Sequence, residues 1–408
     1  RDMRGVASLS PANVIGFLAE DDQVDDVPPA GSKSGANELF ALSSLGVPRA
    51  AVVAWSPDGS KLATGRPDRD TRVWQGVGNP SKNLWSAMST IRTQQSGIIT
   101  SFAWSGDGNR LLTGGVDGIA RLWRPASEHK ALRWETVGTL SGHKGMITAV
   151  DWSRDGVFVA TGSVDGNARI WILGQPASRQ PPALSHNGGT VLALAFAHDG
   201  PRLITGCSDR VVRIWQAPPS DKAAASPDYS SVADGSGDHI ELSDFNRALQ
   251  ANGGRHVPAR SKRELLAWEC VAVLEGHRGS VTSIAVAEAN FATASRDDSV
   301  RVWQPAGDCY EVAAKMAFDH RVDAICFSPD GSSMVTGCSD KKARIWQPEG
   351  TQWRLIATLG PMLDSVTSVS WSPDGMRIAC GAADASTSIW HRKFATLWEQ
   401  VELRLASV

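Results

Sequence analysis

The sequence predicts an all-β protein built from seven repeated units of four short strands each. The eleven residues GCSDRVVRIWQ at 206–216 return almost unchanged as GCSDKKARIWQ at 337–347. The Trp near the end of this motif occurs in seven copies, and an Asp stands six residues before each of them. The runs between these landmarks alternate apolar and polar residues, which is the period of strands. A part that returns this often is structural, because a catalytic site is needed only once.

The spacing of the seven Trp residues supports a repeat of one fixed size. The intervals are 49, 48, 44, 88, 43 and 44 residues, so the interval of 88 contains one unit and an insertion. An Arg lies two residues before the Trp in six copies, and Ser388 replaces it in the last. The Trp residues are Trp74, Trp123, Trp171, Trp215, Trp303, Trp346 and Trp390, and the Asp residues are Asp68, Asp117, Asp165, Asp209, Asp297, Asp340 and Asp384.

Four strands are expected in each unit. The first is a run such as ITAVDW at 147–152, and it ends at a turn such as SPDG at 56–59, where Pro presets φ and Gly accepts a positive φ. The second, FVATGS at 158–163, leads to the turn that carries the Asp. The third, ARIW at 168–171, ends on the Trp. The fourth follows the pattern W-x-x-V-x-x-L, as in Trp134, Val137 and Leu140.

The fourth-strand pattern has eight candidates for seven units. Leu39, Leu42 and Leu45 fit it, and so do Trp398 and Val401 in the C-terminal segment. Because the C-terminal segment fits better, we favour it as the fourth strand of the last unit. We further expect an N-terminal extension or linker over 1–36, a repeat domain over 37–408, and a flexible insertion over 216–263 between the third and fourth strands of the fourth unit.

These repeats resemble the WD-repeat β-propeller family. The resemblance rests on the period near 44, the Gly-His pairs at 142–143 and 276–277, and the Trp that ends each third strand. It covers the chain from about residue 38 onward, although Gln, Arg, Ile or His follows the Trp in place of the Asp of the family name. The resemblance implies a seven-bladed β-propeller of four-stranded antiparallel blades, in which neighbouring sheets cover each other's faces.

Composition excludes several classes of protein. Hydrophobic residues make up 42% of the chain, and the formal net charge of −2 gives no field that would attract nucleic acid or an anionic membrane. No apolar run reaches the roughly 18 residues that a membrane span requires. The six Cys residues form no C-x-x-C pair, so we expect free thiols in a cytoplasmic protein, no metal site and no cofactor.

Two sets of residues have the composition of a Ser–His–Asp triad. They are His143, Ser163 and Asp165, and, at similar spacing, His277, Ser295 and Asp297. The resemblance implies instead that each set forms a buried network from the His through the Ser and Asp to the ring nitrogen of Trp171 or Trp303. We favour the structural interpretation, because the other units lose these residues: Cys207 and Cys338 replace the Ser, and His186 and His320 are the remaining candidates for the His.

The sixteen Trp residues argue against binding of single-stranded nucleic acid. Seven end third strands, four end first strands and five begin fourth strands, so none remains for an exposed stacking platform.

The resemblance also implies a partner-binding face, formed by the loops that lead into first strands and by the Asp turns. The residue before each turn Asp lies on it, and so do the residues after the His positions. The first group is Pro67, Val116, Val164, Ser208, Arg296, Ser339 and Ala383, and the second is Lys144, Arg278 and Arg321. Such a mixed apolar and basic rim suits a partner with acidic and apolar groups.

We therefore predict a non-catalytic protein-interaction scaffold, or the sensor or adaptor part of a larger protein or complex. One alternative is a structural subunit that docks a neighbour through the insertion at 216–263. An alternative of another class is a hydrolase that uses His143, Ser163 and Asp165.

Overall fold

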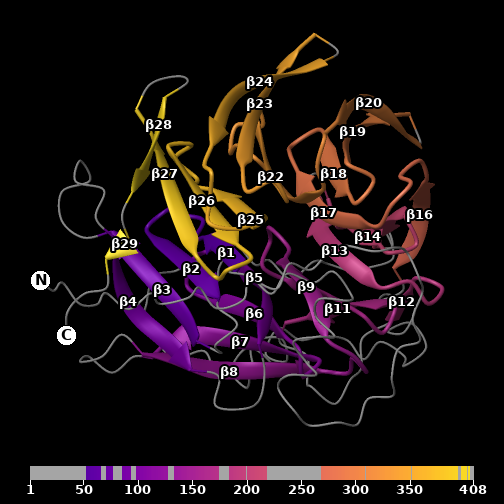
Figure 1. The fold of residues 1–408 in the computed structure, drawn as a ribbon. Coiled ribbons are helices and arrows are strands. Elements are labelled where there is room, and N and C mark those ends of the chain that lie inside the picture. The colour runs from indigo at the N-terminus through magenta and orange to yellow at the C-terminus, as the bar shows by residue number, and fades with distance from the viewer. Residues whose placement is uncertain are drawn as a thin grey trace, which may run out of the picture.

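The computed structural model shows seven β-sheets arranged in a ring (Figure 1). It describes residues 52–65, 70–76, 85–92, 98–126, 133–173, 183–198, 200–217, 268–307, 309–350, 352–393, 397–401 and 403–404. The predictions for Asp68, Pro67, the extension at 1–36, the segment at 39–45 and nearly all of the insertion fall outside these residues.

Each sheet is one blade with four strands in chain order, and we number the blades 1 to 7 along the chain. Blade 1 contains β1 (Val52–Trp55), β2 (Lys61–Gly65), β3 (Asp70–Gly76) and β4 (Trp85–Arg92). Blade 2 contains β5 (Ile99–Trp104), β6 (Leu111–Gly115), β7 (Ile119–Pro125) and β8 (Trp134–Ser141). Blade 3 contains β9 (Ile147–Trp152), β10 (Phe158–Ser163), β11 (Asn167–Ile172) and β12 (Ala183–Ser185).

The remaining blades repeat this order. Blade 4 contains β13 (Val191–Phe196), β14 (Arg202–Cys207), β15 (Val212–Gln216) and β16 (Glu269–Leu274). Blade 5 contains β17 (Val281–Val286), β18 (Phe291–Ser295), β19 (Ser299–Ala306) and β20 (Cys309–Ala317). Blade 6 contains β21 (Val322–Phe327), β22 (Met334–Cys338), β23 (Ala343–Glu349) and β24 (Gln352–Leu359). Blade 7 contains β25 (Val366–Trp371), β26 (Arg377–Ala382), β27 (Thr387–Arg392) and β28 (Trp398–Val401).

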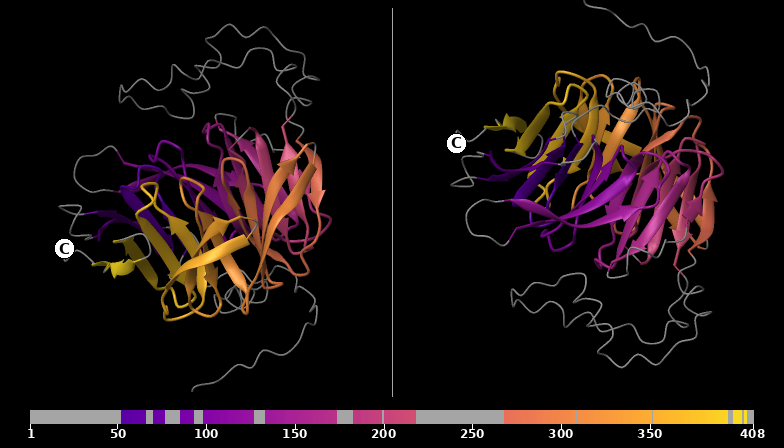
Figure 2. Two further views of the ribbon diagram at one scale, coloured as in Figure 1. Left: turned by 90° about the horizontal axis from the view of Figure 1, so that it is seen from above. Right: turned by 90° about the horizontal axis from the view of Figure 1, so that it is seen from below.

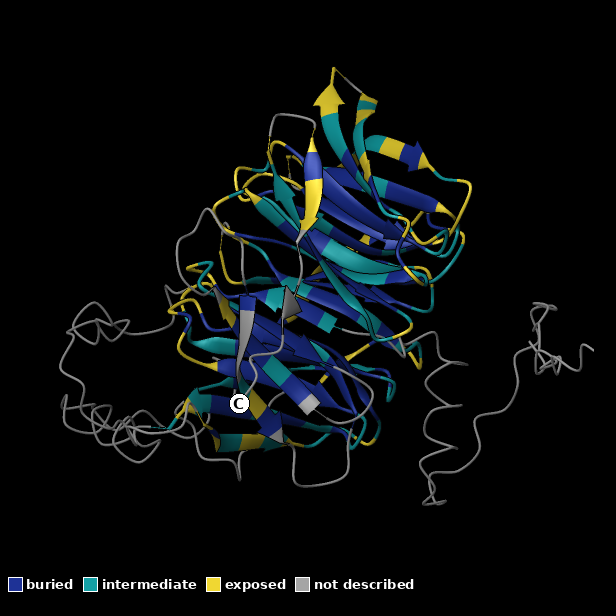
Figure 3. Ribbon diagram, turned by 60° about the vertical axis from the view of Figure 1, so that its left-hand side comes forward, coloured by how far each residue is buried: buried dark blue, intermediate teal, exposed yellow. Residues whose placement is uncertain are grey.

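The first strands line the centre of the ring. Contacts pass from β1 to β5, β9, β13, β17, β21 and β25 in turn and return from β25 to β1, so the circle is complete. The fourth strands lie at the outer rim, and their exposed faces contrast with the buried inner strands in Figure 3. In the two views of Figure 2, the strands of all blades run between the two faces of the ring.

The C-terminal segment supplies the fourth strand of blade 7, as predicted. β28 pairs antiparallel with β27, from Trp398 opposite Arg392 to Val401 opposite Ile389. A short further strand, β29 (Leu403–Arg404), then pairs in parallel with β4 of blade 1. The chain therefore links its last blade to its first by backbone hydrogen bonds at the rim.

A β-bulge explains the three-residue spacing of the fourth-strand pattern. In blade 2, Trp123 pairs with Thr136 and Leu122 with Gly138, so Val137 is an extra residue on the outer strand. An extra residue shifts the alternation of sides, which places Val137 on the side that faces the core. The same shift occurs opposite the third-strand Trp in blades 1, 4, 5 and 6.

The core repeats from blade to blade around large aromatic rings. Trp55 and Trp85 meet edge to face with their centroids 5.0 Å apart, and Trp371 and Trp398 do so at 5.8 Å. Rings of this size each remove about 150–250 Å² from water, which is why thin sheets can form stable interfaces with one another. The Trp residues thus serve the packing, as their positions in the sequence predict.

Candidate functional site

A Thr in the second strand accepts a hydrogen bond from the third-strand Trp in six blades. Trp171 Nε1 donates to Thr161 Oγ1 at 2.9 Å, and Trp303 Nε1 donates to Thr293 Oγ1 at 2.9 Å. The other four pairs have distances between 2.8 and 3.0 Å and are Trp74–Thr64, Trp123–Thr113, Trp215–Thr205 and Trp346–Thr336. Each Thr stands ten residues before its Trp and is buried.

In blades 3 and 5 this pair extends into a chain of four side chains. Asp297 Oδ2 lies 3.0 Å from His277 Nδ1, and His277 Nε2 lies 2.8 Å from Thr293 Oγ1. His143 makes the same two contacts with Asp165 and Thr161, at 2.9 and 2.8 Å. A neutral His satisfies every group, since Nδ1–H donates to the carboxylate and Nε2 accepts from the Thr hydroxyl. The path therefore runs from Asp through His and Thr to Trp.

The expected path, with the Ser between the His and the Trp, is wrong. Ser163 Oγ donates to the carbonyl of Gly145 at 3.1 Å and accepts the amide of Asp165 at 3.1 Å. Ser295 makes the equivalent bond to Gly279 O at 2.9 Å. Both Ser residues end their second strands, so they face the leading loop. The Thr two residues earlier lies on the same side of the strand and faces the ring nitrogen.

The same geometry leaves the hydrolase alternative without a triad. Neither Ser hydroxyl is hydrogen-bonded to its His, and Ser163 and Ser295 are both fully buried. A nucleophile must be activated by an adjacent base and be reachable by substrate.

In blades 2, 4, 6 and 7 the turn Asp has a different partner. Asp117 pairs with Arg121 at 2.6 Å, and Asp209 pairs with Arg213 at 2.6 Å. Asp340 pairs with Arg344 in blade 6. In blade 7, where Ser388 replaces the Arg, Asp384 is exposed and accepts from Ser386. The Arg four residues after the Asp thus takes the place of the His as its partner.

The two further His candidates differ from each other. His186 is fully buried, and its Nε2 lies 2.8 Å from Thr205 Oγ1, while its Nδ1 lies 2.9 Å from the carbonyl of Leu184 instead of the turn Asp. His320 is exposed, because it lies two residues closer to its strand than the His residues of blades 3 and 5. The expectation that His320 fills the same role is wrong.

Burial and hydrogen bonds act in opposite directions on these groups. Burial would raise the pKa of Asp297, but hydrogen bonds from Ser299, the Arg278 amide and His277 outweigh it and hold the pKa at about 2. Burial lowers the pKa of His277 and lowers that of His186 to about 4, where the charge of Arg213 adds to the effect. In blade 5 these shifts favour a charged Asp297 beside a neutral His277 at neutral pH.

We define the Asp-turn face as the side of the ring formed by the leading loops and the Asp turns. Val116 and Val164 lie on it, partly buried against Ile98 and Met146 of blades 2 and 3. Lys144 and Arg278 are exposed on leading loops. Lys144 therefore lies on the same leading loop as Met146 of the apolar cluster, whereas Arg278 lies on the leading loop of blade 5.

Ser208 and Ser339 serve mainly to join neighbouring blades. Ser208 Oγ accepts the amide of Thr190 at 2.9 Å, and its carbonyl accepts from Ser280 of blade 5. The Ser339 carbonyl accepts from Ser365 of blade 7 at 3.2 Å. These two residues from the predicted rim are thus occupied by loop-to-loop bonds.

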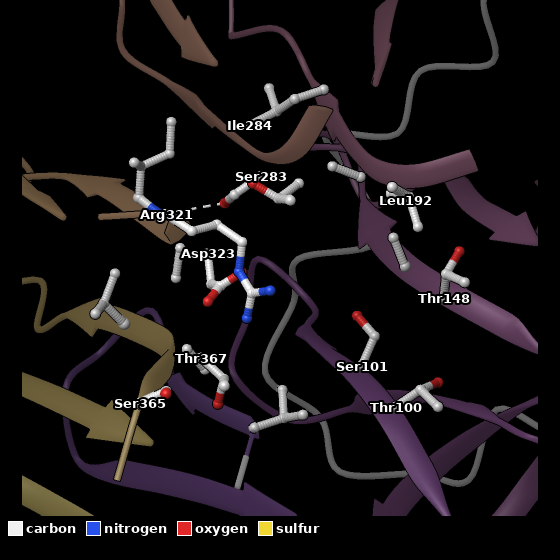
Figure 4. Close-up of a pocket in the computed structure, with 18 of the residues that line it drawn as sticks. Thr100, Ser101, Thr148, Leu192, Ser283, Ile284, Arg321, Asp323, Ser365 and Thr367 are labelled. Carbon is white, nitrogen blue, oxygen red and sulfur yellow. Dashed lines mark hydrogen bonds and ion pairs between the residues drawn. The ribbon is translucent and has the colours of Figure 1, made fainter. Parts of the chain in front are cut away.

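The centre of the Asp-turn face opens into a cavity of about 580 Å³, lined by residues from all seven first strands. Arg296 and Arg321 line it, and so do Asp323 and Asp364. In Figure 4 the guanidinium of Arg321 points into this space beside Asp323, with Arg321 Nε 2.8 Å from Asp323 Oδ1. Of the predicted rim residues, Arg296, Arg321 and Ala383 therefore line this cavity.

Comparison with known families decides the classification. The model of the WD40 family, described as WD domain, G-beta repeat, matches seven segments that together cover more than half of the chain: 51–75, 85–124, 134–171, 181–216, 268–304, 315–347 and 353–391. The chain belongs to the WD40 repeat family. Proteins of this family are commonly interaction scaffolds. A comparison with curated proteins found no match.

Six of the seven WD40 segments extend over two blades. The segment 85–124 begins with the outer strand β4 of blade 1 and continues through β5, β6 and β7 of blade 2. The segment 134–171 does the same for blades 2 and 3. Neighbouring blades are therefore joined by the chain itself.

The Thr residues were missing from the prediction of the network, although the sequence contains a signal for them. A Thr occurs ten residues before the Trp in six of the seven WD40 repeats, as regularly as the Arg two residues before it. The alternation of apolar and polar residues predicts the second strand, but it does not distinguish a hydrogen-bonding Thr within the strand from any other small residue.

The described residues give further limits on the site. No group of three or more His, Cys, Asp or Glu residues among them could hold a metal ion. No described helix could span a membrane. All six Cys residues are free; Cys207, Cys338 and Cys380 are buried, Cys326 is partly buried, and Cys270 and Cys309 are exposed.

Proposed function

We propose that this WD40 chain is a non-catalytic scaffold or sensor/adaptor module, part of a larger protein or complex in the cytoplasm, that binds a protein or peptide on its Asp-turn face. The observation that carries the proposal is the combination on this face of an apolar cluster, exposed basic groups and a central cavity. Val116 and Val164 provide the apolar part, and Lys144, Arg278 and Arg321 provide the charge. A partner with acidic and apolar groups complements this surface.

The charge of the face offers a direct test. Lys144→Glu together with Arg278→Glu reverses two exposed charges of the rim without touching the cavity. The control, Arg110→Glu together with Arg154→Glu, makes the same change at exposed positions of the turns between first and second strands, on the opposite face. Each purified protein is immobilised, and the bound proteins are quantified by mass spectrometry.

We expect the rim variant to lose partners that the wild type and the control retain, by about tenfold or more, since like charges facing each other across an interface cost several kcal/mol. Retention of the same partners by both variants would refute a role for this rim.

We also propose that the four-residue networks of blades 3 and 5 are structural. Asp297→Ala removes the carboxylate 3.0 Å from Nδ1 of the buried His277 and leaves only a longer contact with Ser299 Oγ at 3.5 Å. This loss is expected to cost about 1–3 kcal/mol of the free energy of unfolding. Denaturant unfolding measures this loss. Unchanged stability of both Asp297→Ala and Asp165→Ala would contradict the structural role.

A further inference from the structure

We propose that the Arg296 and Arg321 guanidinium groups in the central cavity form a binding site for a single oxyanion, the carboxylate or phosphate group of a ligand. This inference rests on the proposed function and names the place where an acidic group of the partner would bind. Its basis is the hydrogen bonding of the polar side chains in the cavity. Several hydroxyl groups already bond to the neighbouring blade, whereas the Arg296 guanidinium makes no hydrogen bond to the described residues.

The hydroxyl groups of the cavity wall are already used to join blades. Thr100 Oγ1 donates to the carbonyl of Ile147 in the next blade at 2.5 Å, and Thr282 Oγ1 donates to that of Val322 at 2.8 Å. Ser101 accepts the amide of Val150 at 3.1 Å, and Ser283 accepts that of Ile325 at 3.2 Å. The hydroxyl protons of Thr100 and Thr282 are therefore engaged between blades, whereas Ser101 and Ser283, labelled in Figure 4, act as acceptors there.

Arg296 differs from these groups, because its guanidinium makes no hydrogen bond and no ion pair within 4 Å with the described residues. It lies at the Asp turn of blade 5 and is partly buried, and its Nε is enclosed but makes no hydrogen bond. Burial lowers the pKa of Arg296 and the neighbouring charge of Arg321 lowers it further, while the charge of Asp323 offsets only part of this effect. An Arg nevertheless stays charged in proteins. An unpaired buried cation is costly, and an anion that reaches it removes much of that cost.

The one carboxylate between the two Arg residues does not neutralise both. Asp323 pairs through Oδ1 with Arg321, while its Oδ2 is buried and has no hydrogen-bond partner among the described residues. Arg321 keeps 44% of its side chain exposed, so it can still turn part of its guanidinium toward a ligand. Guanidinium groups are planar donors that match carboxylate and phosphate oxygens.

Asp364 is a second carboxylate at the cavity, besides Asp323, that opposes anion binding. It lies at the cavity edge on the leading loop of blade 7, and its Oδ1 accepts the amide of Ser365 at 2.7 Å. It makes no ion pair with Arg296 or Arg321 within 4 Å. Removing its charge should therefore strengthen anion binding, which gives the inference a second, opposite prediction.

The test is a calorimetric titration of the whole chain with sodium phosphate and, separately, with sodium acetate at low ionic strength. The variants are Arg296→Gln, Asp364→Asn and, as a control of equal charge change on the opposite face, Arg154→Gln. Circular dichroism and thermal unfolding verify that each variant is folded. Because a hydrogen bond to a charged group is worth about 1.5–3 kcal/mol, we expect Arg296→Gln to weaken anion binding about tenfold or more.

Supporting results are saturable binding by the wild type, weakening in Arg296→Gln, strengthening in Asp364→Asn and no change in Arg154→Gln. Preference for phosphate over acetate would assign the site to a phosphorylated ligand, and equal binding would assign it to a carboxylate. The inference is overturned if the wild type binds neither anion, or if Arg296→Gln and Arg154→Gln bind equally well. In that case the proposed function still stands if Lys144→Glu with Arg278→Glu abolishes partner capture.

Discussion

Trp390 is the one described third-strand Trp whose indole nitrogen has no hydrogen-bond partner among the described residues. Cys380 occupies the position ten residues earlier where the other six blades carry a Thr. Cys380 is 1% exposed, so water does not replace the missing acceptor. A buried donor left without an acceptor costs free energy.

We therefore expect Cys380→Thr to stabilise the protein. A neutral hydrogen bond contributes about 1 kcal/mol, which would appear as a higher free energy of unfolding in a denaturant titration. The reverse change in blade 6, Thr336→Cys, removes the acceptor of Trp346 and should lower stability by a similar amount. If Cys380→Thr gives no gain while Thr336→Cys gives a loss, the unpaired indole of Trp390 is not what limits blade 7.

His186 makes stability depend on pH. Its pKa is lowered to about 4 in the folded protein by burial and by the charge of Arg213, whereas it is near 6.5 in the unfolded chain. The unfolded state therefore binds more protons between these values. The contribution of His186 is complete above pH 6.5 and is lost as the pH falls toward 4. Between pH 7 and 5 this loss amounts to about 2 kcal/mol.

The measurement is denaturant unfolding of the wild type and His186→Gln at pH 7 and pH 5. We expect the wild type to lose more stability than the variant over this range. Asp151 acts in the opposite direction, because burial raises its pKa to about 6, but it is present in both proteins and cancels in the comparison. Equal pH dependence of the two proteins would show that His186 is protonated as easily in the folded state as in the unfolded one.

At the residue scale, the sequence indicates which side chains lie close together but not which of them are hydrogen-bonded to each other. In blades 3 and 5 the repeated Asp, His and Trp lie in one chain of hydrogen bonds that also includes a Thr. The Thr was missed and the Ser was assigned its role. The two lie on the same side of the strand, and their positions along it decide which one meets the ring nitrogen: Ser163 ends β10 and bonds to the leading loop, whereas Thr161 lies within the strand and accepts from Trp171. The spacing of residues along the chain does not show which side chain meets the ring nitrogen. It also does not show that Arg296 and Arg321 line one cavity.

At the scale of the strand, the Gly that follows the Thr has a packing role. A Cβ on Gly206 of β14 would lie 2.5 Å from Val281 Cγ1 and 3.0 Å from its Cβ, on β17 of the next blade. Gly337 has the same relation to Val366 of blade 7, at 2.6 Å. These positions have no side chain because the next blade packs directly onto the backbone.

Gly206→Ala is accordingly expected to push blades 4 and 5 apart and to lower the free energy of unfolding by about 1–3 kcal/mol, the usual cost of overpacking. Blade 5 supplies the control, since it carries Ala294 at the equivalent place. Ala294→Gly should cost only about 0.5–1 kcal/mol, from greater freedom of the unfolded backbone. A Gly206→Ala protein as stable as the wild type would mean that Val281 moves aside freely.

At the scale of the whole molecule, the end of the chain completes the ring. Trp398 of β28 is only 9% exposed and belongs to the core of blade 7. A chain that ends at Lys393 lacks the Trp398 indole and the whole outer strand β28. Removal of a buried Trp side chain alone costs about 3–5 kcal/mol of the free energy of unfolding. A chain that ends at Val401 keeps β28 and lacks β29, so it should lose much less. Thermal unfolding compares the two, and equal melting temperatures would contradict the importance of β28.

The ring itself could be predicted from the sequence, because seven Trp and seven Asp residues can be counted and their spacing leaves room for one insertion. The choice of the C-terminal fourth strand also followed from the pattern at Trp398 and Val401. The parallel pairing of Leu403 with Trp85 could not be predicted. It joins two residues at opposite ends of the chain, and its direction depends on the path around blade 7 and not on any local pattern.

The offset between repeat and blade bears on how such a chain can change in length during evolution. One WD40 segment supplies the outer strand of one blade and three inner strands of the next. If recombination removed one whole segment, the three inner strands before it would be followed directly by the outer strand of the next segment. That strand could complete their sheet, so every remaining sheet would still have four strands. Gene rearrangement can thus alter the number of blades in the ring without breaking strand pairing.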